Sequence, residues 1–173
     1  MYNSFELIDL LKKHNCNIAI HQHDPLFTVH DSKRLRGKIE GAHSKNLFLK
    51  NKKNKFFLLT CEETDNFELK KISKSLQFGN TSFAKEEYLL KYLNIKPGSV
   101  SPFALLNDVG GVVDFYLEQT LYKSQFINFH PLINTSTITI ETNKFIEFMI
   151  ENDKKIHIFS STEGTVLKTY GKK

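Results

Sequence analysis

The sequence is poor in the residues that build disulfide scaffolds, thiolate metal sites and membrane spans. Cys16 and Cys61 are its only cysteines, and they form no C-x-x-C pair. This argues against a disulfide framework and fits a reducing compartment. No apolar run approaches the roughly 18 residues that a membrane helix needs. The N-terminal stretch MYNSFELIDLLKKHN has acids inside its apolar part and no cleavage site, so we expect no signal peptide. We expect a cytoplasmic protein without membrane contact.

Arginine is almost missing, which limits what the positive charge can mean. Arg34 and Arg36 are the only arginines, so the formal net charge of +5 comes almost wholly from lysine. Lysine is a point charge suited to phosphate, whereas the guanidinium fork is common in base recognition. The charge therefore fits a polyanionic partner or a solvated lysine surface, and charge alone favours the solvated surface.

Apolar periodicity predicts four helices, over residues 4–14, 65–77, 84–93 and 143–151. Ser4 and Thr142 are the expected caps of the first and the last. Asp65 and Glu68 resemble a relaxed capping box for the second, and Gly79 is expected to stop it. Three lysines of that second helix are expected to face solvent: Lys70, Lys71 and Lys74.

Strands are expected where apolar residues alternate with polar ones or form short runs. These stretches are NIAIHQH, NLFLK, KFFLLT, FALL, VVDFYLE, TITIE and, as the last strand, KIHIFS. NLFLK and KFFLLT, joined by NKKN, predict a hairpin with a charged tip. Helices interspersed with hairpins predict an α/β (α+β) fold with a mixed, largely antiparallel sheet and helices packed on it. Because no repeat or linker is visible, we expect a single domain over residues 1–173.

The common catalytic motifs are missing from the sequence. It holds no G-x-S-x-G elbow, P-loop or G-x-G-x-x-G, and neither cysteine lies in an activating context. His21 and His23 share one face of a predicted strand, but no third ligand is evident by spacing. We therefore expect neither a metal nor another cofactor.

One candidate site lies at the start of the predicted hairpin. Ser44, Lys45 and Asn46 offer three different polar head groups just before an apolar strand. Such a set is more typical of the floor of a site than of a solubilising face.

Two loops add further candidates. In PGSVSPF, Pro97 and Pro102 restrict φ while Gly98 permits unusual backbone geometry, so the loop could aim successive N–H groups at a carbonyl or an anion. The same loop could equally be a tight connection between elements. In NFHPLIN, His130 precedes a proline and Asn134 follows. A lone histidine beside proline is more often structural than functional.

Taken in order, GAHSKNLFLK, PGSVSPFALLND and NFHPLINT resemble the signatures of the YbaK/ProXp-ala superfamily of trans-editing aminoacyl-tRNA deacylases. The similarity runs from about His23 to Ile158. HSKN, PFALLND and FHP make the chain most similar to the ProXp-ala (PrdX-like) branch, which clears alanine mischarged onto proline tRNA. The resemblance implies a YbaK-like domain with a curved mixed sheet surrounded by helices.

The resemblance also implies roles for individual residues. Lys45 is then the essential lysine, with Asn46 and Ser44 beside it in the pocket. Gly98, Ser101 and Pro102 belong to the catalytic loop that faces the ester. His130 helps shape amino-acid selectivity, with Asn134 in the same stretch. From the stretch PLFTV alone, and not from the resemblance, Val29 or Phe27 is the expected apolar wall of the pocket.

The implied activity is hydrolysis of the ester of Ala-tRNA(Pro), a carboxylic ester hydrolysis assisted by the substrate itself. Partners would be tRNA(Pro) and prolyl-tRNA synthetase. The lysine-rich segment is not part of the family motifs, and two interpretations of Lys50, Lys52, Lys53 and Lys55 stay open: contact with acceptor-stem phosphates, or a solvated surface. Two alternatives stay open: a deacylase for Cys-tRNA(Pro) or another small residue, and a non-catalytic tRNA-binding or synthetase-associated module.

Overall fold

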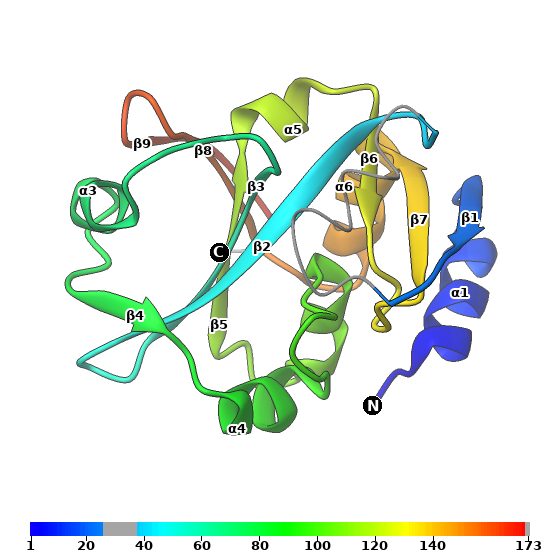
Figure 1. Cartoon of the computed structure of the whole chain (residues 1–173), viewed down its shortest axis with the longest axis horizontal. Coiled ribbons are helices and arrows are strands. Elements are labelled where there is room, and N and C mark those ends of the chain that lie inside the picture. The colour runs from blue at the N-terminus through cyan, green and yellow to red at the C-terminus, as the bar shows by residue number, and fades with distance from the viewer. Residues whose placement is uncertain (26–37, 172–173) are drawn as a thin grey trace.

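The computed structural model describes residues 1–25 and 38–171, and its centre is one twisted sheet. Within these residues the sheet has nine strands: eight follow the order β1-β7-β6-β2-β3-β5-β8-β9, and the ninth, β4, pairs with β2 beside this path (Figure 1). The strands are β1 (Ile18–Gln22), β2 (Ala42–Asn51), β3 (Phe56–Glu62), β4 (Thr81–Phe83), β5 (Val113–Glu118), β6 (Phe126–Phe129), β7 (Ser136–Glu141), β8 (Ile156–Ser160) and β9 (Thr165–Tyr170).

The pairing confirms the expected mixed, largely antiparallel sheet. Strand β2 pairs antiparallel with β3 and β4, and antiparallel pairs also join β1 to β7, β6 to β7 and β8 to β9. The parallel pairs are β2 with β6, β3 with β5 and β5 with β8. Strand β2 crosses the whole molecule in Figure 1 and connects both halves of the sheet. Its residues can therefore contribute to a site on either half.

Helices cover both faces of this sheet. They are α1 (Ser4–Lys13), α3 (Leu69–Ser75), α4 (Glu86–Tyr88), α5 (Gln119–Lys123) and α6 (Thr142–Glu151). A π-helical turn over Leu89–Leu93 continues α4, and a 3₁₀ helix spans Pro102–Asn107. None of the described helices is long and apolar enough to cross a membrane.

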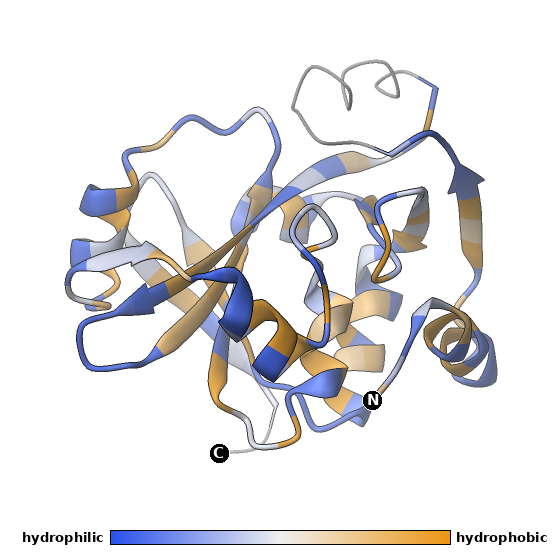
Figure 2. Cartoon of the chain, turned by 60° about the horizontal axis from the view of Figure 1, so that its bottom comes forward, coloured by the Kyte–Doolittle hydropathy of each residue, from blue (hydrophilic) through white to orange (hydrophobic). Residues whose placement is uncertain are grey.

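Two hydrophobic clusters lie on opposite faces of the sheet. The larger one packs α1, α6 and the 3₁₀ helix against the strands, with Phe103 at its centre and fully buried. The smaller one lies between α3 and the β2–β3–β8 region, and includes Leu49, Phe57 and Phe159. Figure 2 shows the hydrophobic segments gathered on the inner parts of strands and helices. Alternate residues of β2 thus face different cores.

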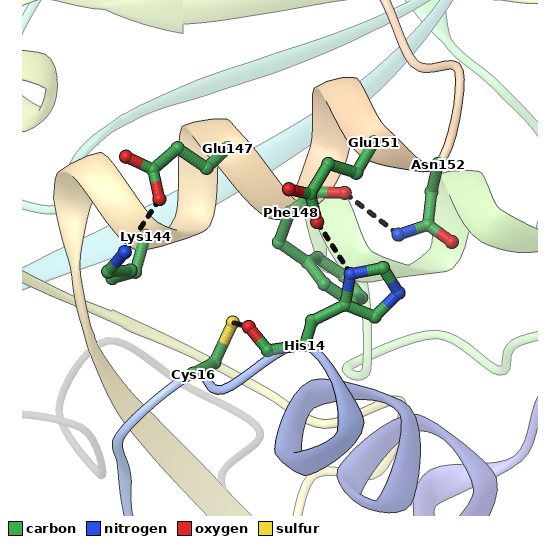
Figure 3. A network of polar contacts seen from close by, with 7 residues as sticks. All are labelled: His14, Cys16, Lys144, Glu147, Phe148, Glu151 and Asn152. Carbon is green, nitrogen blue, oxygen red and sulfur yellow. Dashed lines mark hydrogen bonds and ion pairs between the residues drawn. The ribbon is translucent and has the colours of Figure 1, made fainter.

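The N-terminal helix α1 is fastened to α6 by a polar contact (Figure 3). His14, which follows α1, lies with Nδ1 2.6 Å from a carboxylate oxygen of Glu151. Its ring also meets Phe148 edge-on at 5.2 Å between centroids. The buried Cys16 thiol donates to the main-chain carbonyl of His14, and burial raises the pKa of this thiol. The contact holds the C-terminal end of α1 against α6.

The expectation of a strand at FALL is wrong, because these residues belong to the 3₁₀ helix. The Ser101 hydroxyl accepts the N–H of Phe103, and Pro102 at the first helical position starts the turn. Every residue from Pro102 to Asn107 is buried, so the apolar run is a buried helical segment. A short apolar run does not by itself distinguish the two structures.

Three expected helix starts need correction. Asn3, not Ser4, caps α1 in a reciprocal capping box with Glu6. Helix α3 begins at Leu69 without a side-chain cap, so Asp65 and Glu68 form no capping box, and the helix ends at Ser75 before Gly79.

Thr142 does not cap α6 either. Its hydroxyl donates to the carbonyl of Ser124 at 2.5 Å and ties the start of α6 to the end of α5. At the other end of the chain KIHIFS is not the last strand, because β9 follows it in an antiparallel pair with β8.

Candidate functional site

The polar residues at the start of β2 point to opposite faces of the sheet. Lys45 pairs with Cys61 of β3, whereas Asn46 pairs with Thr60. Because successive side chains of a strand alternate, Lys45 shares a face with His43 and Leu47, and Ser44 shares the other face with Asn46. The three neighbours therefore do not form one continuous floor.

The Lys45 amine is held by the turn that follows β3. It donates a hydrogen bond to the main-chain carbonyl of Asp65 and lies 5.3 Å from the centroid of the Phe67 ring. A carbonyl oxygen and an aromatic face both stabilise an ammonium group. The side chain is half-buried, so the structure holds a fixed cation at the edge of the β2–β3 pair.

Acidic groups lie close to this amine. Burial raises the pKa of Asp65, and the nearby carboxylates of Glu118 and Glu62 raise it further while Lys45 lowers it. One oxygen of Asp65, Oδ2, is buried and makes no hydrogen bond to the described residues. Burial also raises the pKa of Cys61 well above its usual value, which keeps this thiol protonated. A protonated, fully buried thiol is unsuited to act as a nucleophile.

Ser44 and Asn46 are fixed by short polar contacts on the opposite face. The Thr60 hydroxyl donates to Asn46 Oδ1 at 2.7 Å, and Ser44 donates to the main-chain carbonyl of Asn128 at 2.8 Å. Asn46 Nδ2 reaches the Ser44 hydroxyl at only 3.5 Å. The amide nitrogen of Asn46 thus keeps most of its donor capacity for another acceptor.

A polar row continues from β2 across β6, β7 and β1. His43 of β2 is paired with Asn128 of β6, so the Asn128 side chain lies on the same face as Lys45. Asn128 Oδ1 accepts from the Thr139 hydroxyl at 2.6 Å, and Thr139 also contacts His21 at 3.2 Å. A second row of this kind joins His23 to Thr137 at 2.9 Å. His21 and His23 therefore have threonine partners.

His130 lies just beyond β6, with its ring 6.0 Å from that of His23. Its Nδ1 is 2.8 Å from the main-chain carbonyl of Ser136, so Nδ1 carries the proton. Burial lowers the pKa of His130, and the neighbouring His23 lowers it further, although the hydrogen bond to Ser136 opposes this. The ring is therefore neutral near pH 7, and its Nε2 is an acceptor.

The loop over residues 98–102 is a rigid connection that opens on solvent at one end. Gly98 is exposed and has φ of +85°, a left-handed backbone that glycine adopts without strain. Ser99 N–H closes a turn on the Lys96 carbonyl at 3.2 Å. Ser101 and Pro102 are buried, and Ser101 caps the following 3₁₀ helix.

The loop is tied to the His130 side of the site. Phe103, directly after Pro102, packs edge-on against Phe129 at 5.7 Å, and Phe129 precedes His130. Among the hydrogen bonds of the described residues, none joins Lys45 to residues 98–102. The structure thus packs the residue after the loop on Phe129, the core residue that precedes His130, and groups Lys45 with Asp65 and Phe67.

The other expected site residues are scattered. Asn134 is half-buried in the turn between β6 and β7. Lys50 turns away from the hairpin tip, since its amine lies 3.2 Å from the Tyr88 hydroxyl and 4.7 Å from that ring centroid. Lys52 and Lys53 are exposed at the tip itself. Phe27 and Val29 lie outside the described residues.

Sequence reasoning missed the residues that surround the predicted ones. Asp65 was expected to start a helix, and no sequence pattern indicated that Phe67 or Asn128 would lie near the candidate residues. All of them are set by contacts between distant segments. Within the described part of the chain, no group of three or more His, Cys, Asp or Glu residues could hold a metal ion.

Comparisons with known proteins add an independent line of evidence. The sequence matches the model of the aminoacyl-tRNA editing domain over residues 23–148. It is 34% identical over 133 residues to prolyl-tRNA synthetase associated domain-containing protein 1 of Bos taurus, which covers 74% of this chain and 77% of the bovine one. It is 29% identical over 125 residues to prolyl-tRNA editing protein ProX of Acetoanaerobium sticklandii, covering 72% and 76% of the two chains.

The fold agrees with these matches. A solved structure described as a proposed trans-editing enzyme for prolyl tRNA synthetase has a TM-score of 0.66 and covers 92% of this chain and 97% of its own. At 13% identity, that likeness shows the fold alone. The resemblance found in the sequence motifs is thus confirmed. The chain belongs to the aminoacyl-tRNA editing domain family.

Proposed function

We propose that this protein is a trans-editing hydrolase that deacylates Ala-tRNA(Pro). The observation that carries the proposal is that the editing-domain match spans residues 23–148 and so includes Lys45, the 98–102 loop and His130. Two relatives are named for prolyl-tRNA editing and for association with prolyl-tRNA synthetase, which supports tRNA(Pro) and that enzyme as partners. The reaction would take place in the cytoplasm, where charged tRNA is used.

The chemistry needs little from the protein, because an aminoacyl ester is already activated. Water attacks the ester carbonyl carbon, the bond to the ribose oxygen breaks, and the water proton passes to that leaving oxygen. A lysine with an ordinary pKa near 10.4 is protonated at neutral pH and is a poor general base. The Lys45 ammonium is therefore proposed to stabilise the negative charge that develops on the carbonyl oxygen.

Stabilisation of this oxyanion is the step where the 98–102 loop would help. Main-chain N–H groups of a rigid loop are suited to it, and one such donor is typically worth roughly 3 kcal/mol. Gly98 gives the loop a backbone geometry that a side chain would strain, while Ser101 and Pro102 hold its far end in the core. No hydrogen bond of the described residues joins the loop to Lys45, so the proposal requires the bound ester to lie between the loop and the Lys45 amine.

His130 is proposed to recognise the amino group of the substrate. An alanyl ester carries a free ammonium group, and the neutral His130 ring offers Nε2 as an acceptor for it. Asn46, Ser44 and Asn134 remain candidates for binding the substrate, but Ser44 and Asn46 face the other side of β2 from Lys45, so they are not proposed to contact the ester carbonyl together with it. Phe27 and Val29 remain the proposed apolar wall.

Selectivity for alanine follows from size. A synthetase pocket built for proline cannot strongly reject the smaller alanine, because each missing methylene is worth only about 1–3 kcal/mol. A second, smaller pocket excludes proline by steric overlap and hydrolyses what can enter. Cysteine is close enough in size to alanine that deacylation of Cys-tRNA(Pro) is the nearest alternative.

A second class of function is a synthetase-associated module without catalysis; the name of the bovine relative supports the association with the synthetase. The decisive experiment measures hydrolysis of alanyl, cysteinyl, seryl and prolyl esters of tRNA(Pro) by the wild type and by Lys45→Ala. We expect the alanyl ester to be hydrolysed fastest, and Lys45→Ala to abolish hydrolysis while the protein stays folded. No hydrolysis of any ester by the wild type would support the non-catalytic module, and full activity of the variant would overturn the role of Lys45.

A further inference from the structure

A basic surface surrounds the turn at residues 77–80, where the hairpin tip, β4 and α3 meet at one end of the molecule (Figure 1). Two hollows of about 380 and 750 Å³ lie on either side of this turn and share Gln77, Gly79 and Asn80 in their walls. We call it the 77–80 surface and define it by Lys52, Lys53, Lys55, Lys70, Lys74 and Asn80. Hydrophilic residues predominate at this end in Figure 2.

The charge of the two hollows is one-sided. Five lysines line them against one acid, Asp114, whereas the whole chain has 24 basic residues against 19 acidic ones. The five lysines are exposed, and no salt bridge is recorded for them among the described residues. Lys144, by contrast, pairs with Glu147 at 2.8 Å. The 77–80 surface therefore concentrates positive charge that the protein itself does not neutralise.

The backbone that carries these lysines is fixed. The buried Asn51 side chain accepts the N–H groups of Lys53 and Lys55 at 2.9 and 3.0 Å and donates to the Phe78 carbonyl at 2.8 Å. Beneath the turn, the Phe57 and Phe78 rings stack at 4.1 Å with 13° between their planes. One buried amide thus connects the hairpin tip to the 77–80 turn, so that binding here orders side chains only, not backbone.

Helix α3 is connected to the same frame. Ser73 of α3 and Thr81 of β4 share a hydrogen bond of 2.6 Å, and Thr81 is paired with Asn51 in the β2–β4 ladder. Lys70 and Lys74 project from the same helix as Ser73. The sequence alone favoured a solvated face for Lys70 and Lys74, because only the folded chain brings them to the same turn as the lysines of the hairpin tip.

We propose that the 77–80 surface binds the phosphate backbone of RNA. This inference rests on the proposed function and deepens it, because it assigns the stem of the tRNA to a surface that includes α3. Lysine binds phosphate as a point charge and reads no base, so a surface with lysines and no arginine fits a sequence-independent contact with backbone phosphates. Regularly spaced phosphates also match lysines arranged on both sides of one turn.

The distance along β2 supports a long ligand. Lys45 and Asn51 lie six residues apart on one strand, which corresponds to about 20 Å at roughly 3.3 Å per residue. A ligand that contacts both places has to be longer than an aminoacyl group on its terminal nucleotide, and a polynucleotide meets this requirement. The acyl end would lie at Lys45 while the stem lies across the 77–80 surface.

The test measures binding of deacylated tRNA(Pro) transcript by fluorescence anisotropy over a series of salt concentrations. Each lost phosphate contact reduces the slope of log affinity against log salt by about 0.7–0.9. We expect Lys70→Gln/Lys74→Gln to reduce the slope by up to about 1.8 and Lys52→Gln/Lys53→Gln/Lys55→Gln by up to about 2.7. The matched control is Lys12→Gln/Lys13→Gln on α1, whose exposed lysines lie at the other end of the sheet.

Three outcomes are informative. Affinity and slope of the α3 variant equal to those of the control would overturn the proposal. Unchanged RNA binding with weaker binding to prolyl-tRNA synthetase would overturn it in favour of a protein partner. Hydrolysis of 3′-alanyl-adenosine, which lacks the tRNA stem, separates catalysis from RNA binding. The variants of the 77–80 surface should hydrolyse this substrate at the wild-type rate, whereas Lys45→Ala should not hydrolyse it. A wild type that hydrolyses neither Ala-tRNA(Pro) nor 3′-alanyl-adenosine, while its variants show the expected changes in the salt dependence of RNA binding, would overturn the proposed function but support the RNA-binding surface.

Discussion

The Lys45 amine is bound to the main chain of Asp65, twenty residues further along the chain. The contact uses the carbonyl, not the carboxylate, so it places the ammonium group without neutralising it. The Phe67 ring, two residues later, covers the same amine at 5.3 Å. The turn after β3 therefore positions Lys45, the residue on which the proposed function depends.

Replacing Phe67 by leucine should slow deacylation without unfolding the protein. A cation–π contact is worth about 0.5–2 kcal/mol, so we expect kcat to fall by about 2- to 30-fold. Single-turnover hydrolysis of Ala-tRNA(Pro) measures the effect. Phe83→Leu is the control, because Phe83 is 65% exposed and lies on β4. Equal rates for the two variants would show that the ring does not position Lys45.

The stability of the protein should fall as the pH drops below 7, because two partly buried histidines have lowered pKa values in the fold. Burial lowers the pKa of His130 and of His157 below the usual value of about 6.5. The unfolded chain then binds protons that the folded chain does not, so the free energy of unfolding decreases as the pH falls through 6.5. We expect urea midpoints to decrease between pH 7.5 and 5.

The matched variants separate the two histidines. His130→Gln and His157→Gln should each flatten this pH profile, and the double variant should flatten it most. Urea denaturation at five pH values between 5 and 7.5 provides the measurement. A His130→Gln profile parallel to that of the wild type would show that the pKa of His130 is the same in the folded and the unfolded chain, so that the fold does not disfavour its protonation.

Local patterns in the sequence were sufficient for much of the fold. The β2–β3 hairpin and β7 were predicted because apolar runs and alternation are properties of consecutive residues. Strand β9 was missed because all but the last of its residues are exposed, so it shows no alternation. Strand β6 was not predicted, because it has only four residues, Phe126–Phe129, and the last two of them belong to the NFHPLIN motif.

The candidate site was predictable only as separate motifs. Lys45 and His130 could be named from their neighbours in the chain, but their environments depend on pairings such as that of His43 with Asn128. The opposite directions of Lys45 and Asn46 do follow from strand alternation. No sequence pattern indicated that Asp65 would supply a carbonyl to a lysine twenty residues before it.

The contact between His14 and Glu151 should stabilise the docking of α1 on α6 by a small, salt-dependent amount (Figure 3). The two side chains are 26% and 58% exposed, and half-exposed ion pairs are typically worth about 0.2–1 kcal/mol. A double-mutant cycle with His14→Ala and Glu151→Ala measures the coupling free energy. We expect a positive coupling that decreases in high salt. Purely additive effects would show that the contact adds nothing beyond the packing of His14 on Phe148.

The largest loss of stability is expected at Phe103, where the 98–102 loop enters the core. This side chain is fully buried and lies within 6.1 Å, between ring centroids, of Phe129, Phe145 and Phe148. Truncation of such a ring leaves a cavity, so Phe103→Ala should cost about 3–5 kcal/mol in urea unfolding. Phe5→Ala is the matched control, since Phe5 is 82% exposed and should change stability by at most about 0.5 kcal/mol.

The milder variant Phe103→Leu connects this packing to function. Leucine keeps the core filled but loses the edge-on contact with Phe129, through which the loop is aligned with His130. We expect the folded variant to keep its binding of tRNA(Pro) but to lose part of its kcat for Ala-tRNA(Pro), because the loop N–H groups would shift relative to the ester carbonyl. Hydrolysis and binding measured on the same preparation separate the two effects. An unchanged kcat would mean that Phe103 supports the fold alone and that the loop is aligned by other contacts.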